Sequence, residues 1–147
     1  TNQDAEYDVR VGKAGGRVWL ETSLAIEYFP RKTAKSLVRQ YYRHGRGRAM
    51  TVIKHGGRLK ARQMAPAAAF FACAASTAAA PFSPVAGMVP ISYFIACLAI
   101  GAVLAAKTGQ SGCALAMGVP ASLMHLAWGC GFVLRTLRTN LMSVGGR

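Results

Sequence analysis

The chain has 147 residues, a net charge of +13 and a mean hydropathy of +0.26. All five acids and most lysines and arginines lie within residues 1–62, whereas no charged residue occurs from Gln63 to Ala106. So long an uncharged stretch argues against an ordinary soluble domain and predicts membrane helices. The basic segment beside it favours contact with anionic lipid head groups on the cytoplasmic side over binding to nucleic acid.

The N-terminal segment predicts one helix and two short strands. The Thr1–Asn2 pair can cap a helix that ends near Ala14, because Gly15–Gly16 turns the chain there. Residues 17–20 and 24–29 are rich in β-branched and aromatic side chains, a composition typical of strands.

A basic amphipathic helix is predicted from about Ala34 to Lys54, with Thr33 as its N-cap. Gly45 and Gly47 have low helix propensity, so we expect a bend or a break near them.

Three hydrophobic helices are expected in the rest of the chain. They cover residues 65–81, 85–106 and 113–134, with a tight turn at 81–84 and a polar loop at 107–112. The first is short and alanine-rich, and the third carries Pro120, where a kink is expected. Three crossings would place Arg135 and Arg138 outside, whereas two or four would keep them on the cytoplasmic side, so the number stays open.

The first candidate for chemistry is a group of acids in the N-terminal helix, Asp4, Glu6 and Asp8. A carboxylate here could act as a general base towards a substrate hydroxyl. Alternatively, the three acids only complement the helix dipole.

The second candidate lies on the basic helix and comprises Gln40, Arg43, His44 and Arg46. Gln40 and His44 are four residues apart and so face the same way. The guanidinium forks of the two arginines suit phosphate oxygens. The same pattern also fits an interfacial helix whose arginines reach towards water.

His125 is an ionisable residue within a predicted membrane helix, where such groups are costly. It could have a function or make an interhelical hydrogen bond. The four cysteines, Cys73, Cys97, Cys113 and Cys130, have no metal-ligand spacing and suit helix packing. No metal site is predicted within this chain.

The order of these features resembles glycosyltransferase family 2. Residues 2–10 and 13–20 resemble the end of its catalytic domain, where a Glu-Asp pair opens a helix before a "YRLRKAGGRIW"-like stretch. Gln40-x-x-Arg43-His44 resembles the Gln-x-x-Arg-Trp motif of membrane-bound members, which lies on an interface helix before the spans. The whole is similar to the succinoglycan-biosynthesis (ExoA-like) type. Gln3 departs from the usual Glu, and His44 from the usual Trp.

The resemblance implies three parts. Residues 1–32 would be an α/β remnant, the C-terminal end of a GT-A catalytic domain, and residues 33–62 a basic interface helix. Residues 63–147 would be an α-helical membrane region. By the same resemblance, Asp4 matches the catalytic base. Gln40, Arg43 and His44 match the motif that closes over the donor diphosphate and acceptor, and Arg46 is expected to contact phosphate beside them.

The implied activity is an inverting glycosyltransferase of bacterial exopolysaccharide biosynthesis. It would transfer glucose from a UDP-sugar to a polyprenyl-diphosphate-linked acceptor. A divalent metal, Mg or Mn, is expected for the full-length enzyme, with its ligands outside this chain, which has no Asp-x-Asp.

The expected location is the bacterial inner membrane, as a multi-pass protein with residues 1–62 cytoplasmic. Because the chain starts at Thr1 without a nucleotide-binding fold, we expect a C-terminal fragment that is inactive alone. The alternative is a non-enzymatic basic membrane-anchor protein that binds anionic lipid or a partner protein.

Overall fold

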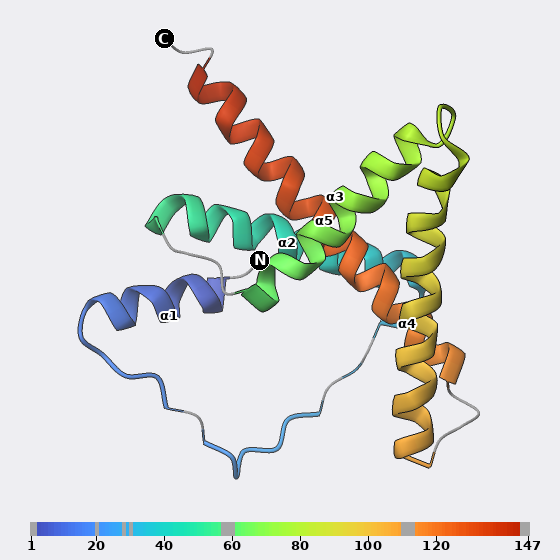
Figure 1. The fold of residues 1–147 in the computed structure, drawn as a ribbon. Coiled ribbons are helices and arrows are strands. Elements are labelled where there is room, and N and C mark those ends of the chain that lie inside the picture. The colour runs from blue at the N-terminus through green and yellow to red at the C-terminus, as the bar shows by residue number, and fades with distance from the viewer. Residues whose placement is uncertain are drawn as a thin grey trace.

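The computed structural model describes residues 3–19, 21–27, 29, 31–56, 61–109 and 114–144. These residues form α1 (Gln3–Lys13), α2 (Ala34–His55), α3 (Ala61–Ala79), the short 3₁₀ helix η1 (Pro84–Gly87), α4 (Met88–Lys107) and α5 (Ala114–Val144) (Figure 1). The predicted Thr1–Asn2 cap and Cys113 lie outside the described residues.

The glycine pair ends α1 as predicted. Gly15 has a φ of +79°, a left-handed conformation that glycine adopts without steric cost. Its N–H donates to the carbonyl of Gly12 at 3.2 Å, and the Gly16 N–H donates to the carbonyl of Val11 at 2.9 Å. This pair of bonds is a Schellman motif, which satisfies carbonyls that the helix end would leave unpaired.

The two predicted strands are wrong in the part that the structure describes, where residues 16–19 and 24–27 are irregular. Leu20 and Tyr28, within the same predictions, lie outside that part. Trp19 and Ile26 are each 86% exposed, with no sheet to cover them. A strand without a neighbour leaves its N–H and C=O groups unpaired, so strand propensity alone does not form one. The expected α/β remnant is therefore absent from the described residues, which are helical or irregular.

The basic helix α2 begins as predicted and ends within a residue of its expected end. The Thr33 side chain accepts a hydrogen bond from the Ser36 N–H at 3.2 Å, and Gly56 follows the last turn with a φ of +63°. The predicted interruption is wrong in one of its two forms: α2 does not break but continues through Gly45 and Gly47. Both glycines are buried, so tertiary packing outweighs their low helix propensity.

Within the described residues, two helical segments are long and apolar enough to cross a membrane, Pro84–Lys107 and Met117–Thr139. α3 contributes only a shorter apolar segment, Met64–Ala79. The three expected hydrophobic helices therefore form, and the first is too short to meet the length of a span. α5 runs as one helix past Pro120 and beyond its predicted end at Leu134.

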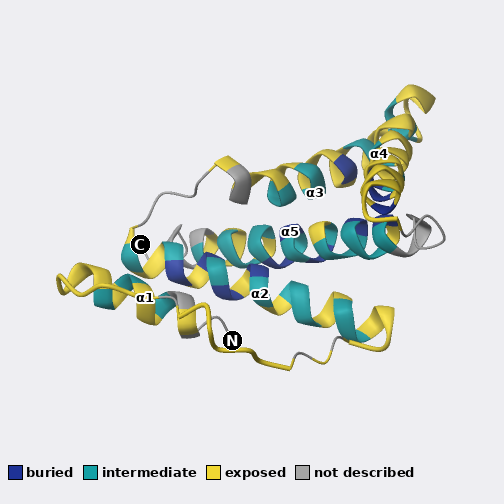
Figure 2. Cartoon of the chain, turned by 90° about the horizontal axis from the view of Figure 1, so that it is seen from below, coloured by how far each residue is buried: buried dark blue, intermediate teal, exposed yellow. Residues whose placement is uncertain are grey.

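The helices are arranged in layers around α5. Figure 2 shows α1 and α2 on one side of α5 and α3 and α4 on the other. α5 contacts α2, α3 and α4, whereas α2 contacts only α5 and α1 among the described elements. The last helix of the chain therefore joins the basic helix to the hydrophobic ones.

The core consists of small residues. Every fully buried position in the described helices is Gly, Ala, Ser, Thr or Cys, for example Ala49, Ala105 and Ser122. Large apolar side chains point outward instead, as Ile91, which is 62% exposed, illustrates on α4. Small residues between helices and large ones outside are the arrangement of helices that pack in lipid.

Glycines of α5 lie directly against the backbones of α2, α3 and α4. Their spacing along α5 explains why α3 and α4 pack on one side of it and α2 on the other. A Cβ on Gly118 would lie 2.7 Å from the backbone of Leu98 in α4, and one on Gly129 would overlap the carbonyl of Pro66 in α3. These glycines are eleven residues, or about three turns, apart and share a face. Gly131 lies about 200° from Gly129 around the helix and faces α2.

The contact between α2 and α5 is reciprocal. A Cβ on Gly131 would overlap the carbonyl of Tyr42, and a Cβ on Gly45 would overlap the carbonyl of Trp128. The two backbones touch because neither helix has a side chain at the crossing. Trp128 stacks on Phe132 beside it, with ring centroids 5.2 Å apart.

We expect Gly131→Ala to weaken the packing of α2 on α5 by about 1–3 kcal/mol, because the added methyl must displace the Tyr42 backbone. The measurement is the midpoint of unfolding by dodecyl sulfate, followed by circular dichroism. Gly12→Ala is the matched control, since no atom lies within 4 Å of a Cβ at that helical glycine. Equal midpoints for the two variants would contradict the contact.

Candidate functional site

Asp4, the predicted base, lies in the first turn of α1 with an exposed side chain. It lines an open hollow together with Glu6, Tyr7, Asp8 and Arg10. The Arg10 guanidinium lies 5.6 Å from the centroid of the Tyr7 ring. A substrate hydroxyl could reach Asp4 from solvent, as a general base requires.

Glu6, the second acid of this group, has a structural role. Its Oε1 accepts from Lys54 Nζ at 2.7 Å and lies 3.0 Å from His55 Nε2, while its Oε2 lies 3.0 Å from Arg10 Nε. Lys13 adds a bond from its Nζ to the carbonyl of His55 at 3.2 Å. These contacts attach α1 to the C-terminal end of α2.

The electrostatics of Glu6 reflect these partners. Hydrogen bonds from Lys54 and then His55 lower the pKa of Glu6 from its ordinary 4.5 to about 2, and the nearby Arg10 charge adds to the effect. Glu6 therefore remains ionised at any pH where the protein would work, bonded to three basic side chains. Among the described residues Asp4 makes no ion pair of this kind, so it is the better candidate for a base within this group.

The residues of the second candidate group take different positions on α2. Gln40 accepts a hydrogen bond from Arg31 Nε at 3.1 Å, which connects the start of the helix to the preceding segment. His44 is half-buried, with its ring tilted against Tyr41 at a centroid distance of 5.8 Å. Arg43 and Arg46 are exposed and line an open hollow with Gly47 and Met50.

The two candidate groups do not share a hollow. α1 contacts α2 at Lys54 and His55, eleven and twelve residues beyond Arg43, which is about 16–18 Å along a helix. Asp4 and the Arg43–Arg46 face thus lie on different parts of the described structure. That they act on one substrate stays a prediction.

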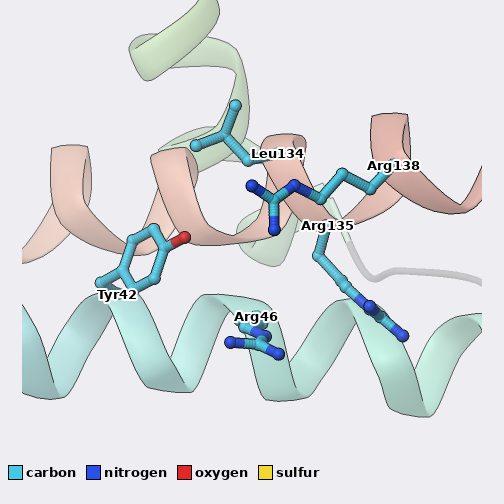
Figure 3. Close-up of a pocket in the computed structure, with 5 residues that line it drawn as sticks. All are labelled: Tyr42, Arg46, Leu134, Arg135 and Arg138. Carbon is cyan, nitrogen blue, oxygen red and sulfur yellow. The ribbon is translucent and has the colours of Figure 1, made fainter.

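The sequence analysis missed a third group, which joins α2 to α5. Arg46 and Tyr42 of α2 line a small hollow with Leu134, Arg135 and Arg138 of α5 (Figure 3). The Nε of Arg135 is buried and has no hydrogen-bond partner. The sequence shows Arg135 and Arg138 at the end of the last hydrophobic segment. Their spacing alone does not predict which residues of the distant basic helix lie beside them.

His125 makes an interhelical hydrogen bond, one of the two roles expected for it. Its Nδ1 lies 3.1 Å from the Tyr93 hydroxyl of α4. Among the described cysteines, Cys73 and Cys97 are buried and Cys130 is half-buried, all with free thiols.

One comparison with known proteins supports the predicted resemblance. The chain is similar to the succinoglycan biosynthesis protein ExoA of Rhizobium meliloti (strain 1021). The two are 40% identical over 133 residues, which is 89% of this chain. The chain spans only 39% of the length of that relative. No family model matches the chain, and no solved structure matches it.

We expect Lys54→Met to raise the pKa of Glu6 from about 2 towards 4.5, because methionine cannot donate the hydrogen bond that lowers this pKa most. The readout is the carboxyl ¹³C shift of Glu6 against pH. Lys35→Met is the control, since Lys35 is an exposed lysine near the other end of α2. If the Glu6 carboxyl titrates with the same midpoint in both variants, Lys54 is not the residue that lowers its pKa.

The depressed pKa also sets a pH window for the docking of α1. The ionised Glu6 stabilises docking in full above about pH 4.5, and this contribution is lost as the pH falls through about 2. Glu6→Gln should remove that dependence, whereas Asp8→Asn on the same helix should keep it.

Proposed function

We propose that this chain is the membrane-interface part of an inverting, nucleotide-sugar-dependent glycosyltransferase of bacterial exopolysaccharide biosynthesis. The full protein would be a family 2 enzyme that transfers glucose from a UDP-sugar to a polyprenyl-diphosphate-linked acceptor. The similarity to the succinoglycan biosynthesis protein ExoA over 89% of the chain carries this proposal.

The fold supports a role at the membrane surface. The basic helix α2 packs against α5, a helix long and apolar enough to span. A lipid-linked acceptor keeps its phosphates at the head-group level, so residues that act on it must be held there. An arginine-bearing helix fastened to a membrane helix by backbone contact provides that position.

The contact between α2 and α5 favours a topology in which the chain crosses the inner membrane twice, through α4 and α5. Arg46 and Arg135 line one hollow, so the basic helix and the end of α5 lie on the same side. With two crossings, the C-terminal end of α5 lies on the same side of the membrane as the segment that precedes α4. All basic clusters are then cytoplasmic, together with residues 1–62, as the positive-inside bias favours.

We assign Asp4 as the base of this reaction. Its carboxylate would take the proton of the acceptor hydroxyl as that oxygen attacks the anomeric carbon. The bond from this carbon to the diphosphate oxygen breaks on the opposite face, so UDP leaves and the configuration inverts.

Arg43 and Arg46 would contact the diphosphate, since both guanidinium groups are exposed in one hollow. Gln40 and His44 would orient the helix and the substrates around it. A Mg or Mn ion would supply further charge to the leaving diphosphate. The described residues contain no group of three or more His, Cys, Asp or Glu that could hold such an ion, so they do not fit a metal centre. We place its ligands outside this chain and expect the chain alone to be inactive.

Asp4→Asn in the full-length protein should lower transfer of labelled glucose to lipid by about 100-fold or more, the usual contribution of a general base. The assay counts label in the organic phase at saturating donor. Glu27→Gln, which neutralises an exposed acid between α1 and α2, should transfer at the wild-type rate. Wild-type transfer by Asp4→Asn would exclude Asp4 as the base.

Arg43→Ala should raise the KM for the donor or the acceptor about tenfold or more, because it removes a charge-assisted hydrogen bond to phosphate. Arg39→Ala removes the same charge from an exposed position on the same helix and controls for the general field of α2. If the two variants have the same kinetics, Arg43 is not a substrate contact.

A further inference from the structure

We propose that Arg46, Arg135 and Arg138 form a site for a phosphate group carried by a membrane lipid. The arginines come from two helices far apart in sequence, and together with Tyr42 and Leu134 they line one hollow (Figure 3). This arginine site differs from the Arg43 face in that α5 supplies two of its three charges.

The helix crossing holds the arginine site in shape. Gly131 of α5 lies against the carbonyl of Tyr42 and the backbone nitrogen of Arg46. Arg135 lies one turn beyond Gly131, and Arg138 nearly one turn further. The backbone contact therefore sets the distance between the arginines of the two helices, so the site is built before any ligand arrives.

The charges of the arginine site are not balanced by the residues that line it. None of these residues is an acid, and the sequence contains no Asp or Glu after Glu27. Glu6 of α1, which pairs with Lys54 and His55, meets α2 at the end away from this hollow. Three guanidinium groups held together repel one another unless an anion joins them.

Arg135 gives the second observation. Its Nε is buried without a hydrogen-bond partner, and a buried donor left unpaired is costly. In Figure 3 the Arg135 side chain reaches from α5 towards α2, where Arg46 lies, so an acceptor placed in the hollow would meet donors from both helices. Phosphate oxygens match the planar guanidinium fork and accept several such bonds at once.

The position and size of the hollow indicate a lipid as the carrier. Arg135 and Arg138 lie at the C-terminal end of the segment Met117–Thr139, at the level where a span meets head groups. The hollow holds only about 20 Å³, close to the volume of one or two water-sized groups. It therefore has room for phosphate oxygens, and Leu134 provides an apolar wall beside it.

Two lipids carry this chemistry, a bulk anionic phospholipid and an isoprenoid diphosphate. The site itself follows from the geometry alone. The second source rests on the proposed function, because only a lipid-linked acceptor brings an isoprenoid diphosphate to this protein.

The test measures lipid binding to the full-length protein in uncharged detergent by native mass spectrometry, without donor sugar. The probes are phosphatidylglycerol, polyprenyl diphosphate and zwitterionic phosphatidylcholine, with inorganic pyrophosphate as a soluble competitor. We expect at least one anionic lipid to bind about tenfold or more tightly than phosphatidylcholine. Preference for polyprenyl diphosphate identifies the acceptor lipid, and equal binding of both anionic lipids identifies the bulk phospholipid.

Arg135→Gln should weaken binding of the anionic lipid about tenfold or more, and Arg39→Gln less than about threefold, since both remove one charge but only the first alters the arginine site. Arg135→Lys keeps the positive charge but lacks the planar guanidinium group, so its loss of lipid affinity should lie between those of the two Gln variants. It also keeps the test valid if Arg135→Gln does not fold. If Arg135→Gln and Arg39→Gln lose the same lipid affinity, the arginine site does not exist.

If an equimolar amount of pyrophosphate displaces the lipid, the ligand is a free phosphate compound and not a lipid. Because no transfer is measured, an inactive protein can still pass this test.

Discussion

The crossing of α2 and α5 is the constraint on which the other features depend. Gly45 and Gly131 leave both helices without a side chain at this point, so each backbone lies against a carbonyl of the other. The contact fastens a strongly basic helix to one that is apolar enough for lipid. It also determines which arginines of α2 face outward and which meet those of α5. The membrane-surface role that we propose therefore rests on this one packing contact.

The core supports the same conclusion from a different direction. A soluble domain of this size gains stability by burying large apolar side chains, which the described residues do not do. Here the buried positions are small and the large side chains face outward. Helices packed in this way gain little from excluding water between them, and rely on close backbone approach and on lipid around them. The Tyr93–His125 bond adds a polar contact between α4 and α5.

Local signals in the sequence predicted local structure well. The Thr33 cap, the glycine stop of α1 and the hydrophobic helices are all decided by neighbouring residues, and all form as expected. Long-range pairing was the source of error. Gly45 suggested a break because its partner on α5 lies far along the chain. The irregular segment around Trp19 suggested a strand, although the described residues form no strand that could pair with it. The pairing of Arg135 with Arg46 was unpredictable for the same reason. The sequence indicated only that Glu6 complements the dipole of α1, because its partner His55 lies 49 residues further along the chain.

The layered arrangement also imposes an order of assembly. α2 contacts α5 and α1 but neither α3 nor α4, so its buried glycine face has no partner until the last helix of the chain has been synthesised. In the membrane arrangement that we propose, α3 and α4 are synthesised and inserted during that interval while α2 lies at the bilayer surface. A chain interrupted before α5 would retain α2 and α4 yet lack the helix that contacts both. Completion of the last helix is therefore the step that turns a loosely attached basic segment into a fixed one.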